Sequence, residues 1–280
     1  MRILITGHRG QLGRALMALL KDEEVMGVGR PDHDITNRQA ITQAIADFAP
    51  HLVIHCAAMT DVEGCARDPE AAYRVNGLGT QNVVLACQAV GAALLYVSTN
   101  EVFDGSKGEP YDEWDTPRPI NPYGRSKRAG EWYVQNLLDR FYIVRTAWLY
   151  AAGGRNFPHR IVQLADERGA LRVVTDEVGS PTYAADLAEA IVALIGTGAY
   201  GVYHLVNEGV TSRYDFAREI LRLTGREQVP VEAITLADYP RASRVPPYTP
   251  LRNTAAAALG IRLRPWQEAV ADFLEVTGYG

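Results

Sequence analysis

Short apolar segments alternate with helix-length segments up to about residue 206, and this alternation limits the possible folds more than any other feature. The apolar segments are nearly continuous hydrophobic runs, as expected for strands that are covered on both faces. Strands and helices in alternation predict parallel strands joined by crossover helices. We therefore expect an α/β fold with a doubly wound, Rossmann-type parallel sheet. The expected strands are 2–6, 25–29, 52–55, 94–98, 142–146, 171–174 and 202–206, and the expected helices are 12–20, 38–48, 71–90, 126–139 and 184–195.

The pattern changes after about residue 207. Amphipathic helices are expected at 212–224 and 266–277, on either side of a proline-rich stretch at 239–250. This predicts a smaller, mostly helical lobe. Together with residues 148–170, the lobe would close over the carboxyl ends of the strands, where open α/β sheets bind ligands. We assign residues 1–147 and 171–206 to a dinucleotide-binding domain, and residues 148–170 and 207–280 to a substrate-binding lobe.

Charge and composition argue against several classes of protein. The 280 residues carry a net charge of -5 and their arginines and lysines are scattered, which disfavours a nucleic-acid-binding protein. The three cysteines form no CxxC pair and the six histidines show no zinc-type spacing, so we expect no metal site. The first strand begins too early for a signal peptide, and no apolar run approaches the ~18 residues of a membrane span. We expect a cytoplasmic protein with no membrane or nucleic-acid partner.

The segment G-H-R-G-Q-L-G, residues 7–13, follows the first expected strand and opens the first expected helix. Glycines at such a turn let a pyrophosphate approach the backbone N–H groups at the helix N-terminus. The spacing of these glycines alone is a weak signal, but the strand–turn–helix setting strengthens it. The loop therefore predicts a dinucleotide site.

The second expected strand ends in Val-Gly-Arg at residues 28–30, where an NAD enzyme commonly has an acidic residue for the ribose 2′-hydroxyl. Arg30 and Arg9 could instead pair with a 2′-phosphate through bidentate hydrogen bonds. Two solvated arginines are the alternative interpretation. We expect NADP(H) to be preferred, with NAD(H) possible. The residues expected beside the adenine and along the cofactor are Asp34, Ile35, Ala57 and Ala58.

Tyr123 and Lys127 lie four residues apart on one face of a helix that Asn121 would cap. Reduction of a carbonyl needs a proton donor, and a phenol is a poor one at its free pKa of about 10. A neighbouring ammonium stabilises the phenolate and brings the pKa toward the working range. Thr99, at a strand end, would hydrogen-bond the same carbonyl oxygen. This pattern predicts a catalytic set of Thr99, Tyr123 and Lys127.

These motifs resemble those of the dTDP-4-dehydrorhamnose reductase family, extended short-chain dehydrogenases that reduce the 4-keto group of a nucleotide-linked deoxysugar. The similarity runs nearly end to end. It includes G-H-R-G-Q-L-G (7–13), A-A-M-T (57–60), S-T-N-E-V-F-D-G (98–105), N-P-Y-G-R-S-K (121–127), R-T-A-W-L-Y (145–150) and V-G-S-P-T (178–182). The resemblance implies an NAD(P)H-dependent oxidoreductase of dTDP-rhamnose or other deoxysugar biosynthesis. It would act on a nucleotide sugar as a monomer or homodimer.

The resemblance also implies roles for individual residues. It makes Thr99, Tyr123 and Lys127 the catalytic set, and it makes Trp148 a wall for the sugar ring. The full set of cofactor-binding residues expected from the motifs and the resemblance is Gly7, Arg9, Gly10, Gln11, Leu12, Gly13, Arg30, Asp34, Ile35, Ala57, Ala58, Thr60, Val97, Tyr123 and Lys127.

Three segments depart from the usual family pattern. Asn100 and Glu101 stand where the family usually has Asp-Tyr, Arg213 stands where a tryptophan is expected, and Val245 stands where an arginine is expected. All three fall where the substrate would bind. Glu101 would be either a hydrogen-bond acceptor or a solvated residue at the rim. The expected substrate-binding residues are Thr99, Asn100, Glu101 and Trp148.

Two alternative functions stay open. The sequence Thr-Asn-Glu at residues 99–101 is similar to the Thr-Asp-Glu of sugar-nucleotide 4,6-dehydratases, in which the two carboxyl groups act as acid and base, and related enzymes are epimerases. Glu101 matches that glutamate, but Asn100 cannot donate a proton as an acid would. In addition, some relatives of the reductases bind NADP as non-catalytic regulatory subunits. A retained cofactor site with an altered substrate side would suit such a protein.

Overall fold

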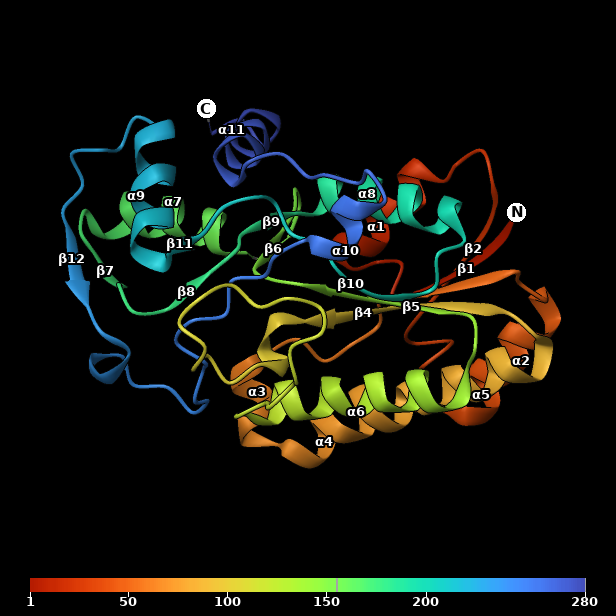
Figure 1. The fold of residues 1–280 in the computed structure, drawn as a ribbon. Helices are drawn as coiled ribbons and strands as arrows, with labels where there is room; N and C mark the ends of the chain where they lie inside the picture. Colours follow the sequence, from red (N-terminus) through yellow and green to blue (C-terminus); the bar gives the residue numbers. More distant parts are fainter. Residues whose placement is uncertain (155, 280) are drawn as a thin grey trace.

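A six-stranded parallel sheet forms the centre of the computed structural model, which describes residues 1–154 and 156–279 (Figure 1). The strand order is β10-β5-β4-β3-β1-β2, so the winding direction reverses between β1 and β3. Open α/β sheets bind ligands at this switch point, outside the carboxyl ends of the strands. Within the ranges assigned to the substrate-binding lobe, residues 155 and 280 lie outside the described residues. The strands are β1 (Arg2–Thr6), β2 (Glu24–Val28), β3 (Leu52–His55), β4 (Ala93–Thr99), β5 (Phe141–Thr146) and β10 (Gly201–His204).

Helices cover both faces of the sheet (Figure 1). On one face lie α1 (Gln11–Leu19), α8 (Ala184–Thr197) and the short α10 (Thr254–Ala258), and on the other lie α2 (Arg38–Phe48), α5 (Thr80–Val90) and α6 (Pro122–Leu137). Neighbouring strand residues therefore enter different hydrophobic clusters. Ile3 and Ile5 pack on the α1 side, and Leu4 packs on the α2 side. Burial on both faces explains why the strands are continuous hydrophobic runs, and it confirms the predicted doubly wound α/β fold.

The helix expected at 71–90 is built from several pieces. It comprises α4 (Pro69–Tyr73), a π-helical segment η1 (Arg74–Gly79) and α5, and it is preceded by α3 (Val62–Arg67). Asn76 lies in the π-helical segment, where it accepts from the Met59 N–H at 2.8 Å and donates to Ser126 Oγ at 2.9 Å. Such π-helical turns are frequent at functional sites. Here the turn ties the loop after β3 to α6.

A second hydrophobic core lies beside the sheet and forms the smaller lobe (Figure 1). The helices expected at 212–224 and 266–277 form as α9 (Arg213–Leu223) and α11 (Trp266–Val276), and they pack with an unexpected helix, α7 (Phe157–Arg168). Short strand pairs connect these helices, so the lobe is less purely helical than expected. The pairs are β6 (Leu149–Tyr150) with β9 (Thr182–Tyr183), β8 (Val178–Gly179) with β11 (Thr211–Ser212), and β7 (Leu171–Val174) with β12 (Val231–Ile234).

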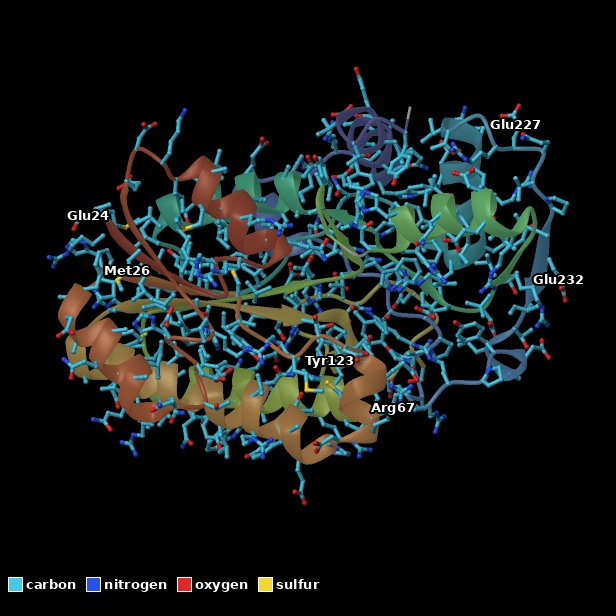
Figure 2. All side chains as sticks on the ribbon, turned by 180° about the vertical axis from the view of Figure 1, so that it is seen from behind. Glu24, Met26, Arg67, Tyr123, Glu227 and Glu232 are labelled. Atoms are coloured by element: carbon cyan, nitrogen blue, oxygen red, sulfur yellow. The ribbon has the colours of Figure 1, made fainter. Side chains whose placement is uncertain are left out.

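The strand expected at 171–174 forms as β7, but its expected place in the main sheet is wrong. It pairs in parallel with β12 at the outer edge of the lobe, where Figure 2 shows Glu232. Arg172 is exposed between buried neighbours and forms an ion pair with Glu232 at 3.0 Å. Because one face of β7 meets solvent, the strand does not need the double cover of a main-sheet strand. Residues 171–174 thus pack with the second core.

None of the helices within residues 1–154 and 156–279 combines the length and the hydropathy that a membrane crossing requires.

Candidate active site

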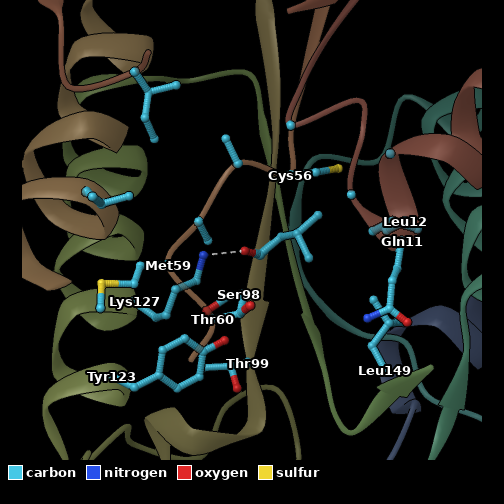
Figure 3. Close-up of a pocket in the computed structure, with 18 of the residues that line it drawn as sticks. Gln11, Leu12, Cys56, Met59, Thr60, Ser98, Thr99, Tyr123, Lys127 and Leu149 are labelled. Atoms are coloured by element: carbon cyan, nitrogen blue, oxygen red, sulfur yellow. Dashed lines mark hydrogen bonds between the residues drawn. The ribbon is translucent and has the colours of Figure 1, made fainter. Parts of the chain in front are cut away.

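A cavity of about 1050 Å³ lies along the carboxyl ends of the central strands. Every residue expected to bind the cofactor or the substrate lines this cavity, including Thr99, Tyr123 and Lys127 (Figure 3). Figure 2, which views the molecule from behind, shows Tyr123 in the interior, below the central strands. The structure therefore brings the expected residues together at one site, while their individual roles stay predictions.

The glycine loop has the geometry that a bound dinucleotide requires. Gly7 has a φ of +68°, and a Cβ there would lie 2.7 Å from the Ala57 backbone nitrogen. A Cβ on Gly13 would clash with the Gly7 carbonyl oxygen. Both positions need glycine because the turn between β1 and α1 passes so close to the end of β3 and to itself. Gln11 Oε1 is buried at this cavity without a hydrogen-bond partner in the described part of the chain, so the loop fits a polar dinucleotide ligand.

The cavity wall after β2 carries two exposed arginines. Arg9 Nη1 donates to the Arg30 carbonyl at 3.4 Å, which keeps the two residues side by side. Asp34 also lines the cavity, but its Oδ1 accepts from both the N–H and the hydroxyl of Thr36 at 2.8 Å. The carboxylate thus stabilises its own turn. Positive charge at the end of β2 fits a cofactor that carries a 2′-phosphate.

Replacing Arg30 with glutamate tests this cofactor preference. We expect kcat/KM for NADPH to fall about 10- to 100-fold, because a hydrogen bond to a charged group contributes roughly 1.5–3 kcal/mol. The value for NADH should hardly change. Steady-state kinetics with both cofactors measure this ratio. Arg38→Glu makes the same charge change at an exposed position outside the cavity and should leave the ratio as it is. Equal kcat/KM for both cofactors in the unaltered protein would contradict the preference.

Tyr123 and Lys127 lie in the first turns of α6, and the start of this helix is set by Asn121. Asn121 Oδ1 accepts from the Gly124 N–H at 2.8 Å, and Pro122 supplies the first helical residue. The side chains of Tyr123 and Lys127 point into the cavity, where Lys127 Nζ donates to the Val97 carbonyl at 2.7 Å (Figure 3). The four-residue spacing therefore places both groups on the face of α6 that meets the end of β4.

Burial controls the ionisation of both groups. It raises the pKa of Tyr123 above that of a free phenol, and the Glu101 carboxylate adds to this effect. It lowers the pKa of Lys127 to about 7, while the Glu131 carboxylate opposes the change. That Lys127 brings the phenol pKa down during the reaction stays a prediction, and in the protein by itself burial raises this pKa. The phenol is neutral at neutral pH, which is the state that a proton donor needs.

Asn100 is held by the protein on both sides of its amide. Its Nδ2 donates to Thr249 Oγ1 at 2.7 Å, and its Oδ1 accepts from Thr99 Oγ1 at 3.2 Å. Thr99 Oγ1 also accepts from the Glu101 N–H at 3.2 Å in the short 3-10 helix η2 (Asn100–Val102). The amide therefore orients the Thr99 hydroxyl. Direct contact between Asn100 and substrate stays a prediction.

Glu101 is partly buried and lines the cavity, so it is not a fully solvated residue at the rim. Its Oε2 accepts from Asn121 Nδ2 at 2.5 Å, which makes it a hydrogen-bond acceptor. A Cβ on Gly124 would clash with the Glu101 carbonyl oxygen, so this glycine lets η2 pack against the first turn of α6. Burial raises the pKa of the Glu101 carboxyl to about 7, and the Asn121 hydrogen bond opposes the rise.

This raised pKa predicts how stability depends on pH. The ordinary pKa of glutamate, 4.5, applies in the unfolded chain, and the folded value is about 7. Ionisation therefore costs the folded state free energy, and this cost grows as pH rises from 4.5 and levels off above 7. Glu101→Gln removes the cost, so we expect the variant to be more stable at pH 8 by roughly 1–3 kcal/mol.

Urea unfolding at pH 5 and pH 8 measures the difference between Glu101→Gln and the unaltered protein. The gain should shrink toward pH 5, because the carboxyl is then mostly protonated in the folded state. Glu109→Gln changes an exposed carboxylate and should show no such pH dependence. A gain of the same size at both pH values would show that Glu101 does not titrate as described.

The opposite wall of the cavity is formed by Trp148, whose φ of +45° is rare for a bulky residue. The Arg213 guanidinium lies 3.5 Å from the centroid of its ring, and Arg213 Nε donates to Glu177 Oε1 at 2.9 Å. Glu177 Oε2 accepts from Arg241, which also binds Glu63 of α3. An alternating chain of charges thus runs from α3 to the Trp148 wall.

Sequence reasoning missed most of this charge chain. The sequence did single out Arg213, because it stands where the family pattern has a tryptophan. No sequence pattern pointed to Glu177 or Arg241, because the residues with which they form ion pairs are distant in the chain. The described residues contain no group of three or more His, Cys, Asp or Glu side chains that could hold a metal ion. Cavity residues that were not anticipated include Met59, Val62, Arg74, Thr146 and Leu149.

Comparison with known proteins covers nearly the whole chain. Residues 1–278 match the family model described as the RmlD substrate binding domain. The chain is 41% identical over 280 residues to a dTDP-4-dehydrorhamnose reductase of Streptomyces griseus, covering 97% of this chain and 92% of the relative. It is 39% identical over 275 residues to a dTDP-4-keto-6-deoxy-D-glucose reductase of Streptomyces niveus, covering 97% and 96%.

A solved structure is similar over the same extent. The crystal structure of a dTDP-4-dehydrorhamnose reductase from Bacillus anthracis in complex with NADP superposes with a TM-score of 0.95, at 39% identity and with 99% of each chain covered. Family model, relatives and solved structure thus agree with the motifs that line the cavity. The chain belongs to the dTDP-4-dehydrorhamnose reductase family.

Proposed function

We propose that this protein uses NADPH, and less well NADH, to reduce the 4-keto group of a dTDP-linked 6-deoxysugar in deoxysugar biosynthesis. One observation carries the proposal: Tyr123, Lys127 and Thr99 converge in the same cavity as the glycine loop. The names of the relatives supply the substrate class, since they are reductases of dTDP-linked keto sugars. We further propose that the protein works in the cytoplasm as a monomer or homodimer.

When bound, the nicotinamide cofactor supplies the hydride for the sugar carbonyl. Residues of the glycine loop would hold its pyrophosphate, and Arg9 with Arg30 would hold the 2′-phosphate. Tyr123 carries the proton that the carbonyl oxygen receives, and its raised pKa keeps that proton in place until the oxygen becomes basic. Trp148 would bound the space for the sugar ring.

The Thr99 hydroxyl lies beside the phenol of Tyr123 in the cavity (Figure 3). A threonine hydroxyl has one hydrogen to donate and two lone pairs that accept. In Thr99 the hydrogen goes to Asn100 Oδ1, and one lone pair accepts from the Glu101 N–H. A hydrogen bond from the Thr99 hydroxyl to the Tyr123 oxygen would lower the pKa of the phenol, and it needs the same hydrogen that now goes to Asn100. Thr99 would donate to the sugar oxygen only after turning away from Asn100.

Lys127 would hold the cofactor ribose and supply positive charge near the phenol. One of its three N–H donors is used by the Val97 carbonyl. The other donors face the cavity, and the Glu131 carboxylate one turn along α6 favours the charged form. Burial lowers the pKa of Lys127 to about 7, so its charged form is present at neutral pH and adds a positive charge where Tyr123 loses its proton.

Oxidation of NADPH, followed by its absorbance, tests the function with a panel of nucleotide-linked 4-keto-6-deoxysugars. We expect turnover with at least one dTDP-linked ketone. Release of a 4-keto-6-deoxysugar from dTDP-glucose would favour a dehydratase instead. The structure speaks against a dehydratase, because Asn100 occupies the position of the acid in that group. Its amide is hydrogen-bonded to Thr99 and Thr249 and has no acidic proton to donate. No turnover with any ketone, together with stoichiometric capture of an enzyme partner, would favour the regulatory alternative.

A further inference from the structure

Arg213 presents an unused pair of nitrogen atoms to the substrate end of the cavity. It is the first residue of α9, and its guanidinium lies over Trp148, 3.5 Å from the ring centroid. Its Nε donates to Glu177 Oε1 at 2.9 Å. Within residues 1–154 and 156–279, neither Nη1 nor Nη2 makes a hydrogen bond. The side chain of Arg213 is 20% exposed and lines the cavity, so both Nη atoms have donors free to bind a ligand there.

The surrounding structure holds Arg213 in this orientation. Antiparallel pairing of β8 with β11 places the Arg213 N–H 3.0 Å from the Glu177 carbonyl, so backbone and side chain bind the same residue. Glu177 is buried, with 9% of its surface exposed. Its second oxygen accepts from Arg241 at 3.3 Å. The hydrogen bond from Nε therefore fixes the orientation of the Arg213 guanidinium, while Nη1 and Nη2 can still donate to a ligand in the cavity.

The chemistry of a guanidinium narrows the choice of ligand group. Arginine stacks on aromatic rings and binds phosphate through parallel N–H donors, which a lysine cannot reproduce. A nucleotide sugar carries a diphosphate next to its sugar ring. A sugar carbonyl at Tyr123 would place that diphosphate within the same cavity, on the lobe side. The other arginine bound to Glu177, Arg241, is already shared with Glu63.

We propose that Arg213 binds the diphosphate of the nucleotide sugar through Nη1 and Nη2, and that Glu177 is a positioning residue for it. The inference rests on the proposed function, since it assumes a nucleotide-sugar substrate. A diphosphate keeps the same charge before and after reduction at the distant sugar carbon. Its contact therefore stabilises ground state and transition state equally and acts on KM, leaving kcat unchanged.

Calorimetry of the NADP-loaded protein with dTDP and with dTMP tests the contact without turnover. We expect Arg213→Met, which keeps the apolar stem over Trp148, to weaken dTDP binding 10- to 100-fold and dTMP binding much less. Arg213→Lys should recover only part of the loss. Arg218→Met removes an exposed arginine from the same helix and should bind both nucleotides as the unaltered protein does. In kinetics, Arg213→Met should raise KM 10- to 100-fold and keep kcat within threefold.

Equal dTDP affinity in the unaltered protein and in Arg213→Met overturns the Arg213 assignment and leaves the proposed reductase activity standing. A fall in kcat with unchanged KM also overturns it, because Arg213 would then act at the reacting carbon. An unaltered protein that binds neither dTDP nor dTMP overturns both proposals. If Arg213→Met does not fold, Glu177→Gln can be measured instead, because it keeps Arg213 but weakens the hydrogen bond that orients the guanidinium. The proposal then requires that Glu177→Gln lower the dTDP affinity by less than the 10- to 100-fold expected for Arg213→Met and leave the NADP affinity unchanged.

Discussion

Replacing Tyr123 with phenylalanine is expected to lower kcat about 100- to 10,000-fold, the range that a positioned acid or base contributes. The variant removes one oxygen from a side chain that is 9% exposed, so the packing against Cys65 and Ala72 is kept. What is lost is the proton donor at the cavity, since the neighbouring Thr99 hydroxyl is already committed to Asn100. Steady-state oxidation of NADPH with the keto sugar measures the change.

The affinity for NADPH provides the control for this variant. Lys127 still donates to the Val97 carbonyl, and the glycine loop is untouched, so the Kd for NADPH should change less than threefold. Undiminished turnover in Tyr123→Phe would end the assignment of Tyr123 as proton donor.

Replacing Glu131 with alanine is expected to destabilise the fold by roughly 3–5 kcal/mol, the cost of leaving a buried charge without its partner. Glu131 is fully buried on α6, and it accepts from Arg145 Nε at 2.9 Å and from Arg145 Nη2 at 3.0 Å. Ser98 Oγ adds a third bond at 2.6 Å. Alanine would leave the guanidinium of Arg145 on β5, which is 2% exposed, without a carboxylate partner in the described part of the chain.

Urea unfolding of a set of variants separates this effect from ordinary loss of packing. The double variant Glu131→Leu with Arg145→Met removes both charges and should recover most of the lost stability. Glu232→Ala breaks the exposed pair with Arg172 and should cost no more than about 1 kcal/mol. A loss below that value for Glu131→Ala would mean that water or another anion compensates Arg145 in the folded protein.

The local patterns of the chain predicted the sheet, and they singled out as cofactor-binding a set of residues that line one cavity. The strands at 2–6 and 52–55 form at the expected residues, since a strand covered on both faces needs a continuous apolar run. Gly7 and Gly13 could be recognised because a turn without room for Cβ atoms excludes other residues. The four-residue spacing of Tyr123 and Lys127 was enough to predict that their side chains lie on the same face of a helix, because α6 carries both residues.

Other features could not be read from local patterns. The strand at 171–174 has an apolar composition similar to the others, and only its pairing with β12 shows that it lies outside the main sheet. The partner of Asn100 is Thr249, 149 residues further along the chain. No spacing rule connects these residues, because the contact depends on how the lobe packs against the sheet.

The sequence by itself determined the alternation of strands and helices, the glycine turn and the placement of Tyr123 and Lys127 on one helix, because each depends on residues within one or two turns of chain. The tertiary structure decided the protonation of Glu101 and Tyr123, since desolvation depends on everything packed around a group. It also decided that Arg213 lies over Trp148 and is held by Glu177. Side chains from distant segments meet there, and their charges and hydrogen bonds act only at the distances that folding creates.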